Sequence, residues 1–180
     1  VDFLLKNLNR KKIILMGHSM GGLLGSLYLV KDDTKISNFV SIASPFNYED
    51  NNTESFNYTM KWAISEQNTE AIKELSEQAS PPIDTFKKLL INGGITKNLS
   101  IEKIFDEMEY SELKEEWQLT TLSVVRTMFS SLNTIKIENS MNKIKIPILF
   151  IAGKNDANVP PNSIESVFSK YKSKKEYILF

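Results

Sequence analysis

The sequence of 180 residues has no cysteine and one histidine. Without cysteine the chain forms no disulfide and holds no metal ion through thiolates. Charge of one sign is also lacking. Lysine plus arginine and aspartate plus glutamate each number 22, so nothing in the charge favours a nucleic acid or an anionic membrane as partner. No apolar run approaches the ~18 residues needed to span a bilayer. A dinucleotide fingerprint, G-x-G-x-x-G, is absent too.

The most informative stretch lies between residues 11 and 31. An apolar run ending at Met16 meets Gly17-His18-Ser19-Met20-Gly21-Gly22, and a helix-compatible run follows. A G-x-S-x-G pentapeptide at a turn from strand to helix is typical of a nucleophilic serine, here Ser19. We expect side chains at Gly17 and Gly21 to collide with each other across so tight a turn. The N–H of Met20 opens the helix, so the pattern predicts an oxyanion donor there.

This pentapeptide resembles the nucleophile elbow of the α/β-hydrolase superfamily, in which nucleophile, acid and histidine follow in that order. The apolar run from Ile146 to Ile151 ends at Gly153, and a polar turn with Asp156 precedes Val159-Pro160-Pro161. That arrangement is similar to the acid loop of the superfamily. The resemblance implies that Asp156 is the acid that orients the catalytic imidazole. An ordinary turn aspartate is the alternative, because Asn-Asp pairs favour turns.

The one histidine of the chain, His18, lies inside the elbow itself. Being adjacent to Ser19, it cannot meet the serine hydroxyl from the side of Asp156, and we expect it to pack beside the elbow. The resemblance implies a catalytic histidine soon after the strand at 176–180. We therefore expect that histidine after Phe180 and interpret the chain, which starts at Val1, as an internal fragment. A degenerate homologue without catalysis is the alternative.

The apolar patterns predict an α/β fold with a parallel sheet. Its strands are expected near 12–16, 37–43, 146–151 and 176–180, and its crossover helices near 21–31 and 162–171. The resemblance implies a partial α/β-hydrolase core at 1–45 and 142–180, with a helical cap at 46–141 that roofs the active site. Half a sheet would leave the elbow strand exposed along one edge, which favours self-association.

Within the cap, apolar residues recur at helical spacing in four stripes: Ile72, Leu75 and Ala79; Phe86, Leu89 and Leu90; Ile101, Ile104, Phe105 and Met108, with Ser100 as a plausible N-cap; and Leu122, Val125, Met128, Phe129 and Leu132. Residues 68–75, Pro81-Pro82 and Gly93-Gly94 are similar to caps of bacterial proline iminopeptidase-like hydrolases. That similarity implies a free amine held by cap carboxylates, with these candidates: Glu49, Asp50, Glu54, Glu66, Glu70, Glu74 and Glu77. Trp62 and Trp117 are candidates to line the pocket.

The resemblance implies a serine hydrolase that cleaves an ester, thioester or amide through an acyl-enzyme on Ser19, without metal or organic cofactor. The expected partner is a small acyl compound or a short peptide, and the expected location is the cytoplasm. Two alternatives stay open, an acyltransferase with the same elbow and a binding homologue without catalysis.

Overall fold

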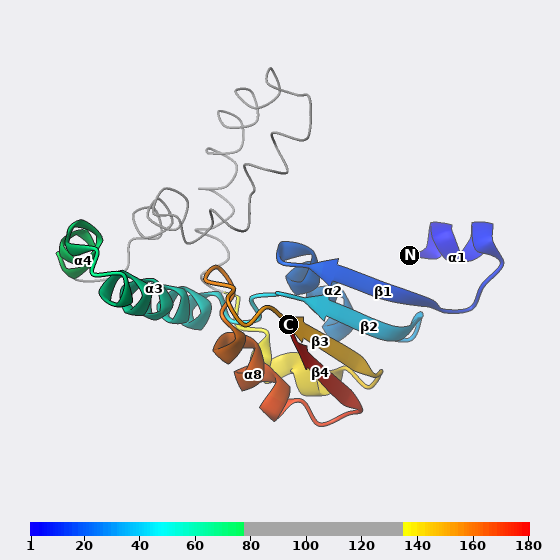
Figure 1. Ribbon diagram of the computed structural model, residues 1–180. Helices are drawn as coiled ribbons and strands as arrows, with labels where there is room; N and C mark the ends of the chain where they lie inside the picture. The colour runs from blue at the N-terminus through cyan, green and yellow to red at the C-terminus, as the bar shows by residue number, and fades with distance from the viewer. Residues whose placement is uncertain (78–134) are drawn as a thin grey trace, which may run out of the picture. The chain divides into compact units, whose positions relative to one another are not determined.

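The computed structural model describes residues 1–77 and 135–180. The chain divides into two compact units, Val1–Glu54 with Ile135–Phe180, and Ser55–Thr134. The first unit holds a four-stranded parallel sheet in the order β1-β2-β3-β4 (Figure 1). These strands are β1 (Ile13–His18), β2 (Ile36–Ile42), β3 (Ile148–Ala152) and β4 (Lys175–Leu179). The predicted parallel sheet is confirmed, whereas the cap boundaries at 46 and 141 stay a prediction.

Two helices make the crossovers between neighbouring strands. Helix α2 (Met20–Lys31) joins β1 to β2, and α8 (Pro161–Lys170) joins β3 to β4. A proline suits the first position of α8, where an N–H would find no partner within the helix. Both predicted crossover helices are confirmed. A short helix, α1 (Asp2–Leu8), precedes β1.

Both crossover helices cover the same face of the sheet. Phe39 pairs with Ile148 and Ser41 with Phe150, so these four side chains share one face. Helix α2 lies close to this face, because a Cβ added at Gly25 would stand only 2.9 Å from the Phe39 ring. Helix α8 packs on it through Phe168, whose ring centroid is 5.7 Å from that of Phe150. The predicted inward stripe of α8 is confirmed, with these members buried or half-buried: Ile164, Val167, Phe168 and Tyr171.

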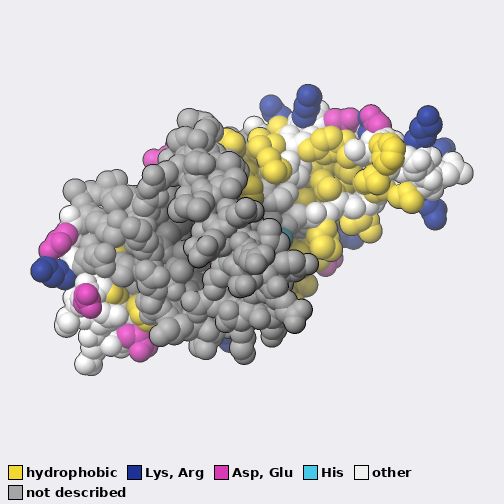
Figure 2. Space-filling model, turned by 90° about the horizontal axis from the view of Figure 1, so that it is seen from above, with side chains coloured by type: hydrophobic (Ala, Val, Ile, Leu, Met, Phe, Trp, Pro, Cys, Tyr) yellow, Lys and Arg dark blue, Asp and Glu magenta, His cyan; other side chains and the backbone are white. Residues whose placement is uncertain are grey.

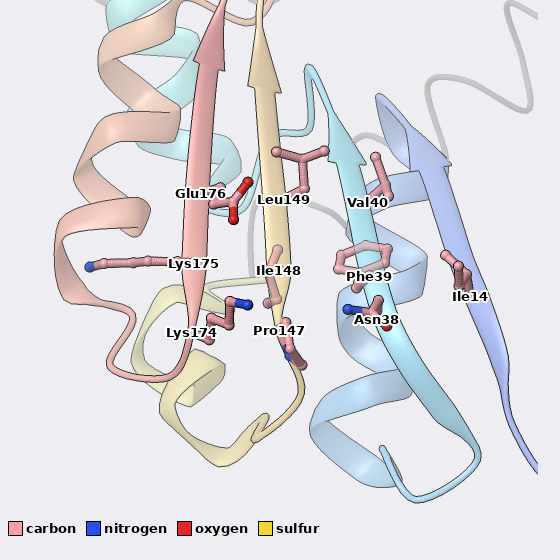
Figure 3. Close-up of a pocket in the computed structure, with 10 residues that line it drawn as sticks. All are labelled: Ile14, Asn38, Phe39, Val40, Pro147, Ile148, Leu149, Lys174, Lys175 and Glu176. Carbon is pink, nitrogen blue, oxygen red and sulfur yellow. The ribbon is translucent and has the colours of Figure 1, made fainter.

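The opposite face of the sheet is open among the described residues. On β1, Ile14 is 64% exposed and Met16 65%. Figure 2, which looks onto the β1 edge, shows hydrophobic side chains gathered there. A hollow of about 350 Å³ lies on the same face, with Asn38, Leu149 and Glu176 on its floor and rim (Figure 3). These residues belong to the middle or the amino ends of their strands, so this hollow is at a distance from Ser19.

Three further elements are described: α3 (Tyr48–Ser65), α4 (Thr69–Ser76) and a 3-10 turn, η1 (Glu138–Lys143). The side chain of Asn68 caps α4 by accepting the N–H of Ala71 at 3.0 Å. In the predicted first stripe, Leu75 is buried and Ile72 half-buried. The rest of that stripe, the other three stripes and Trp117 lie outside the described residues. Within 1–77 and 135–180, no helix combines the length and the apolar character needed to cross a membrane.

Candidate active site

Ser19 sits at a strained turn between β1 and α2. Its φ of 51° and ψ of −120° place it in a region that side-chain-bearing residues rarely occupy. Hydrogen bonds hold this conformation on both sides. The Ser19 N–H donates to the Ile42 carbonyl at the end of β2 (2.8 Å), and the Ser19 carbonyl accepts the N–H of Gly22 (3.0 Å). The turn therefore depends on the neighbouring strand as well as on its own helix.

The glycines around Ser19 differ in whether a side chain would fit at their positions. A Cβ added at Gly17 would lie 2.6 Å from the backbone nitrogen of Gly22 and still closer to the carbonyl of Gly21. A Cβ at Gly22 would collide with the side chain of Ser44, whose Cβ would be 2.6 Å away. Gly21 is different, because a Cβ there would meet no described atom within 4 Å. A side chain is therefore excluded at Gly17 by the backbone of Gly21 and Gly22, whereas a side chain at Gly21 alone would meet no described atom.

Met20 is the first residue of α2, directly after the turn. The first N–H groups of a helix have no acceptor within it, and the helix dipole adds a partial positive charge at this end. The backbone N–H of Met20 therefore lies where an anion beside Ser19 would be stabilised.

Asp156 lies in the loop after β3, and the residue is half-buried. One oxygen, Oδ1, accepts the backbone N–H groups of Asn158 and Val159, each at 2.9 Å. Its own N–H donates to the Gly153 carbonyl at 3.1 Å. In the described part of the chain the other oxygen, Oδ2, has no hydrogen-bond partner. Asp156 is thus a turn aspartate by geometry, and it keeps one oxygen for a further donor.

The sheet brings Ser19 and Asp156 to the same end. Ser19 follows β1 and Asp156 follows β3, and β2 lies between these two parallel strands. At about 4.8 Å per strand, the two strand ends are roughly 10 Å apart. Ligands of open parallel sheets bind outside the carboxyl ends of the strands. A serine and a carboxylate therefore lie at the carboxyl end of the sheet, and the described residues supply no imidazole between them.

His18 is exposed in the described part of the chain instead of packed beside the elbow. It is the last residue of β1, where side chains alternate between the two faces, so it shares the open face with Ile14 and Met16. The expected packing is therefore not found. Among residues 1–77 and 135–180, no group of three His, Asp or Glu side chains could hold a metal ion.

Four of the acidic candidates for binding an amine already have partners. Glu49 lies 2.7 Å from the Lys136 ammonium, and the hydrogen bond and charge of that lysine lower the pKa of the Glu49 carboxyl. Asp50 accepts the side-chain N–H of Asn47 at 2.6 Å. Glu54 lies 3.4 Å from Asn162. Glu77 lies 3.9 Å from the Lys73 ammonium, and Glu66 and Glu70 are exposed.

Two polar residues near the site escaped the sequence analysis. Ser44 is buried beside Gly22, and its hydroxyl donates to the Ile42 carbonyl at 3.1 Å, the same oxygen that binds the Ser19 N–H. Asn51 is buried on α3 and contacts the loop of Asp156. A signal for α3 was present in small polar residues at four-residue spacing, all of them buried: Asn47, Asn51, Ser55 and Thr59.

Comparison with known proteins gives the family. Residues 1–180 match the sequence model of the serine aminopeptidase S33 family. The chain belongs to this family. Among curated proteins, none matches the S33 chain.

Solved structures show the fold of this S33 chain. A lipase-esterase related protein from Clostridium acetobutylicum superposes with a TM-score of 0.58 at 18% identity, covering 95% of this chain and 58% of the other. The proline iminopeptidase of Mycobacterium smegmatis gives 0.61 at 10% identity, covering 98% and 60%. An alpha/beta fold family hydrolase from Bacillus anthracis gives 0.58 at 17%, covering 99% and 63%. The chain is a member of the α/β-hydrolase superfamily with a partial α/β-hydrolase fold, and it spans about three-fifths of the length of these structures.

Proposed function

We propose that the full-length protein is a serine hydrolase that works through an acyl-enzyme on Ser19. The observation that carries this proposal is the strained position of Ser19 between β1 and the N-terminus of α2. Ser19 and Asp156 follow the carboxyl ends of two strands of the same parallel sheet. A serine held in this way presents its hydroxyl beside the N–H of Met20. A carbonyl oxygen that gains negative charge there has a donor ready to receive it.

The proposed reaction has two steps. In the first, Ser19 Oγ attacks the substrate carbonyl and its proton passes to a general base. That base then returns the proton to the leaving alcohol, thiol or amine as the bond to the acyl carbon breaks. In the second step, a water molecule attacks the acyl carbon and gives a proton to the base. The bond between the acyl carbon and Ser19 Oγ then breaks, and the base returns the proton to Oγ. Asp156 orients the base through Oδ2, while the two backbone N–H groups on Oδ1 fix the plane of the carboxylate.

We further propose that the base is a histidine that follows Phe180 in the full-length protein. Phe180 lies at the root of the acid loop, because its N–H donates to the Ala152 carbonyl (2.9 Å) and its carbonyl accepts the N–H of Lys154 (2.7 Å). The chain that follows Phe180 therefore begins close to the loop of Asp156. A histidine within roughly ten residues of Phe180 would support the enzyme, and its absence would favour a binding homologue.

Labelling by a fluorophosphonate tests the nucleophile. The full-length protein should be labelled on the peptide that contains Ser19, and Ser19→Ala should abolish labelling. Ser169→Ala is the matched control, since Ser169 is an exposed serine of α8, and this variant should be labelled like the wild type. No labelling of well-folded wild-type protein would refute the proposal.

Substrate choice is the finer part of the proposal. The family description points to amino-terminal peptide bonds, and two of the similar structures are described as a lipase-esterase related protein and a proline iminopeptidase. We propose small acyl esters as the primary substrates. Release of proline from short peptides with simple acyl esters left intact would overturn this choice. Competing alcohols or thiols in the assay separate hydrolysis from acyl transfer, because dominant transfer identifies an acyltransferase.

A further inference from the structure

A buried amide of helix α3 contacts the acid loop, the segment 153–160 that carries Asp156. Asn51 is only 2% exposed, and its Nδ2 donates to the carbonyl of Asn158 at 3.0 Å. Its Oδ1 lies 3.1 Å from the hydroxyl of Ser163. A carbonyl can only accept, so the Asn158 contact fixes which end of the Asn51 amide carries the nitrogen.

The Asn158 carbonyl and the Val159 N–H belong to one peptide unit. The carbonyl accepts from Asn51, and the N–H donates to Oδ1 of Asp156 at 2.9 Å. A peptide unit is planar and rigid, so fixing its oxygen fixes the direction of its N–H. Hydrogen bonds arranged in series also polarise one another. A continuous path therefore runs from the Asn51 amide through this peptide to the carboxylate of Asp156.

We propose that Asn51 is a positioning residue for the catalytic acid, acting through the peptide between Asn158 and Val159. This inference rests on the proposed role of Asp156. Asn51 stands on the helix that follows β2, and Asp156 stands on the loop that follows β3. The contact therefore fixes the orientation of the Asp156 carboxylate from a helix that is not part of the loop.

A second contact of α3, with the first turn of α8, serves as a control. Asn162 Nδ2 lies 3.4 Å from Oε2 of Glu54, one turn further along α3, and this contact is exposed. It does not involve the peptide that binds Asp156. Asn162→Ala thus removes a neighbouring contact of α3 without breaking the path to the carboxylate.

A double-mutant cycle in the full-length protein tests the proposal. Asn51→Ala should lower kcat on an activated ester about 10-fold, with KM unchanged. Asp156→Asn should lower kcat by about 10⁴-fold, as loss of the correct imidazole tautomer does in serine proteases. If Asn51 acts through Asp156, adding Asn51→Ala to Asp156→Asn should change kcat less than 2-fold. Asn162→Ala should behave like the wild type.

An equal fall in kcat from Asn51→Ala in both backgrounds would overturn the positioning role, because a merely structural effect is independent of Asp156. If Asn51→Ala fails to fold, Asn51→Leu carries the same cycle, since leucine has a similar size but has no donor for the Asn158 carbonyl. Unchanged kcat in Asp156→Asn alone would refute the role of Asp156 and the inference with it. If kcat is unchanged in Asp156→Asn, labelling of Ser19 in that variant shows that the serine nucleophile is intact. Failure of the proposed acid is then distinguished from failure of the proposed serine hydrolase.

Discussion

Alanine in place of Gly17 and alanine in place of Gly21 are expected to shift stability in opposite directions, although both glycines flank Ser19 in one pentapeptide. At Gly17 the new Cβ would lie 2.6 Å from the backbone nitrogen of Gly22, and a backbone atom cannot move aside as a side chain does. Overpacking of this kind costs about 1–3 kcal/mol. At Gly21 the new Cβ meets no described atom within 4 Å, and alanine favours the helix by up to about 1 kcal/mol.

Thermal unfolding of the full-length variants measures the difference. A change of 1 kcal/mol corresponds to about 2–4 °C in Tm for chains of 150–250 residues, so the two variants should move apart on either side of the wild type. Phosphonate labelling of Ser19 reports the geometry of the turn, and it should slow in Gly17→Ala and persist in Gly21→Ala. Equal destabilisation by both substitutions would refute the reasoning from Cβ contacts.

Four further outcomes are expected. Ala43→Gly should raise stability by about 1 kcal/mol in denaturant unfolding, because Ala43 has a φ of 44° that glycine adopts without strain; a loss would contradict this. Burial raises the pKa of Tyr177 to about 12, so stability falls as the pH rises from about 10, the unfolded value, to 12, and Tyr177→Phe should flatten that fall in urea midpoints. Self-association of the 180-residue chain should weaken in Ile14→Lys, a charge on the exposed edge strand, and unchanged sedimentation would argue against the β1 edge. That chain alone should show no turnover of an activated ester, because its one histidine is exposed on the open face; Ser19-dependent turnover would identify another base.

The elements of the sheet could be predicted from local sequence. Strands β1 and β3 contain short apolar runs, which meet Gly17 and Gly153 respectively. Helix α8 has its apolar residues at helical spacing and a proline at its first position, so its inward face was readable as well. The strained turn at Ser19 was also local, because strand, pentapeptide and helix adjoin in the sequence. These predictions succeeded because each of these structures is determined by residues that are adjacent in the sequence.

Helix α3 and Asn51 could not be predicted in the same way. The inner side of α3 carries buried polar residues instead of an apolar stripe, so a search for hydrophobic periodicity passes over it. The partners of Asn51 are more than 100 positions away in the sequence, in the acid loop and at Ser163. The freedom of Gly21 depended likewise on the exact path of the turn. A motif shows that a glycine is present, and only the geometry shows whether a side chain would fit.

The backbone at the carboxyl ends of the strands explains how the strained Ser19 and the distant carboxylate of Asp156 are held in register. Past the strand ends, the N–H of Ser19 donates to Ile42, and the N–H of Ala43 donates to Ile151, each at 2.8 Å. The Phe180 N–H continues the series to Ala152 at 2.9 Å. Each strand end is thus tied to the next by main-chain atoms, including both strained residues. The spacing between Ser19 and Asp156 is therefore set by the sheet itself, and this is the rigidity that the proposed site requires.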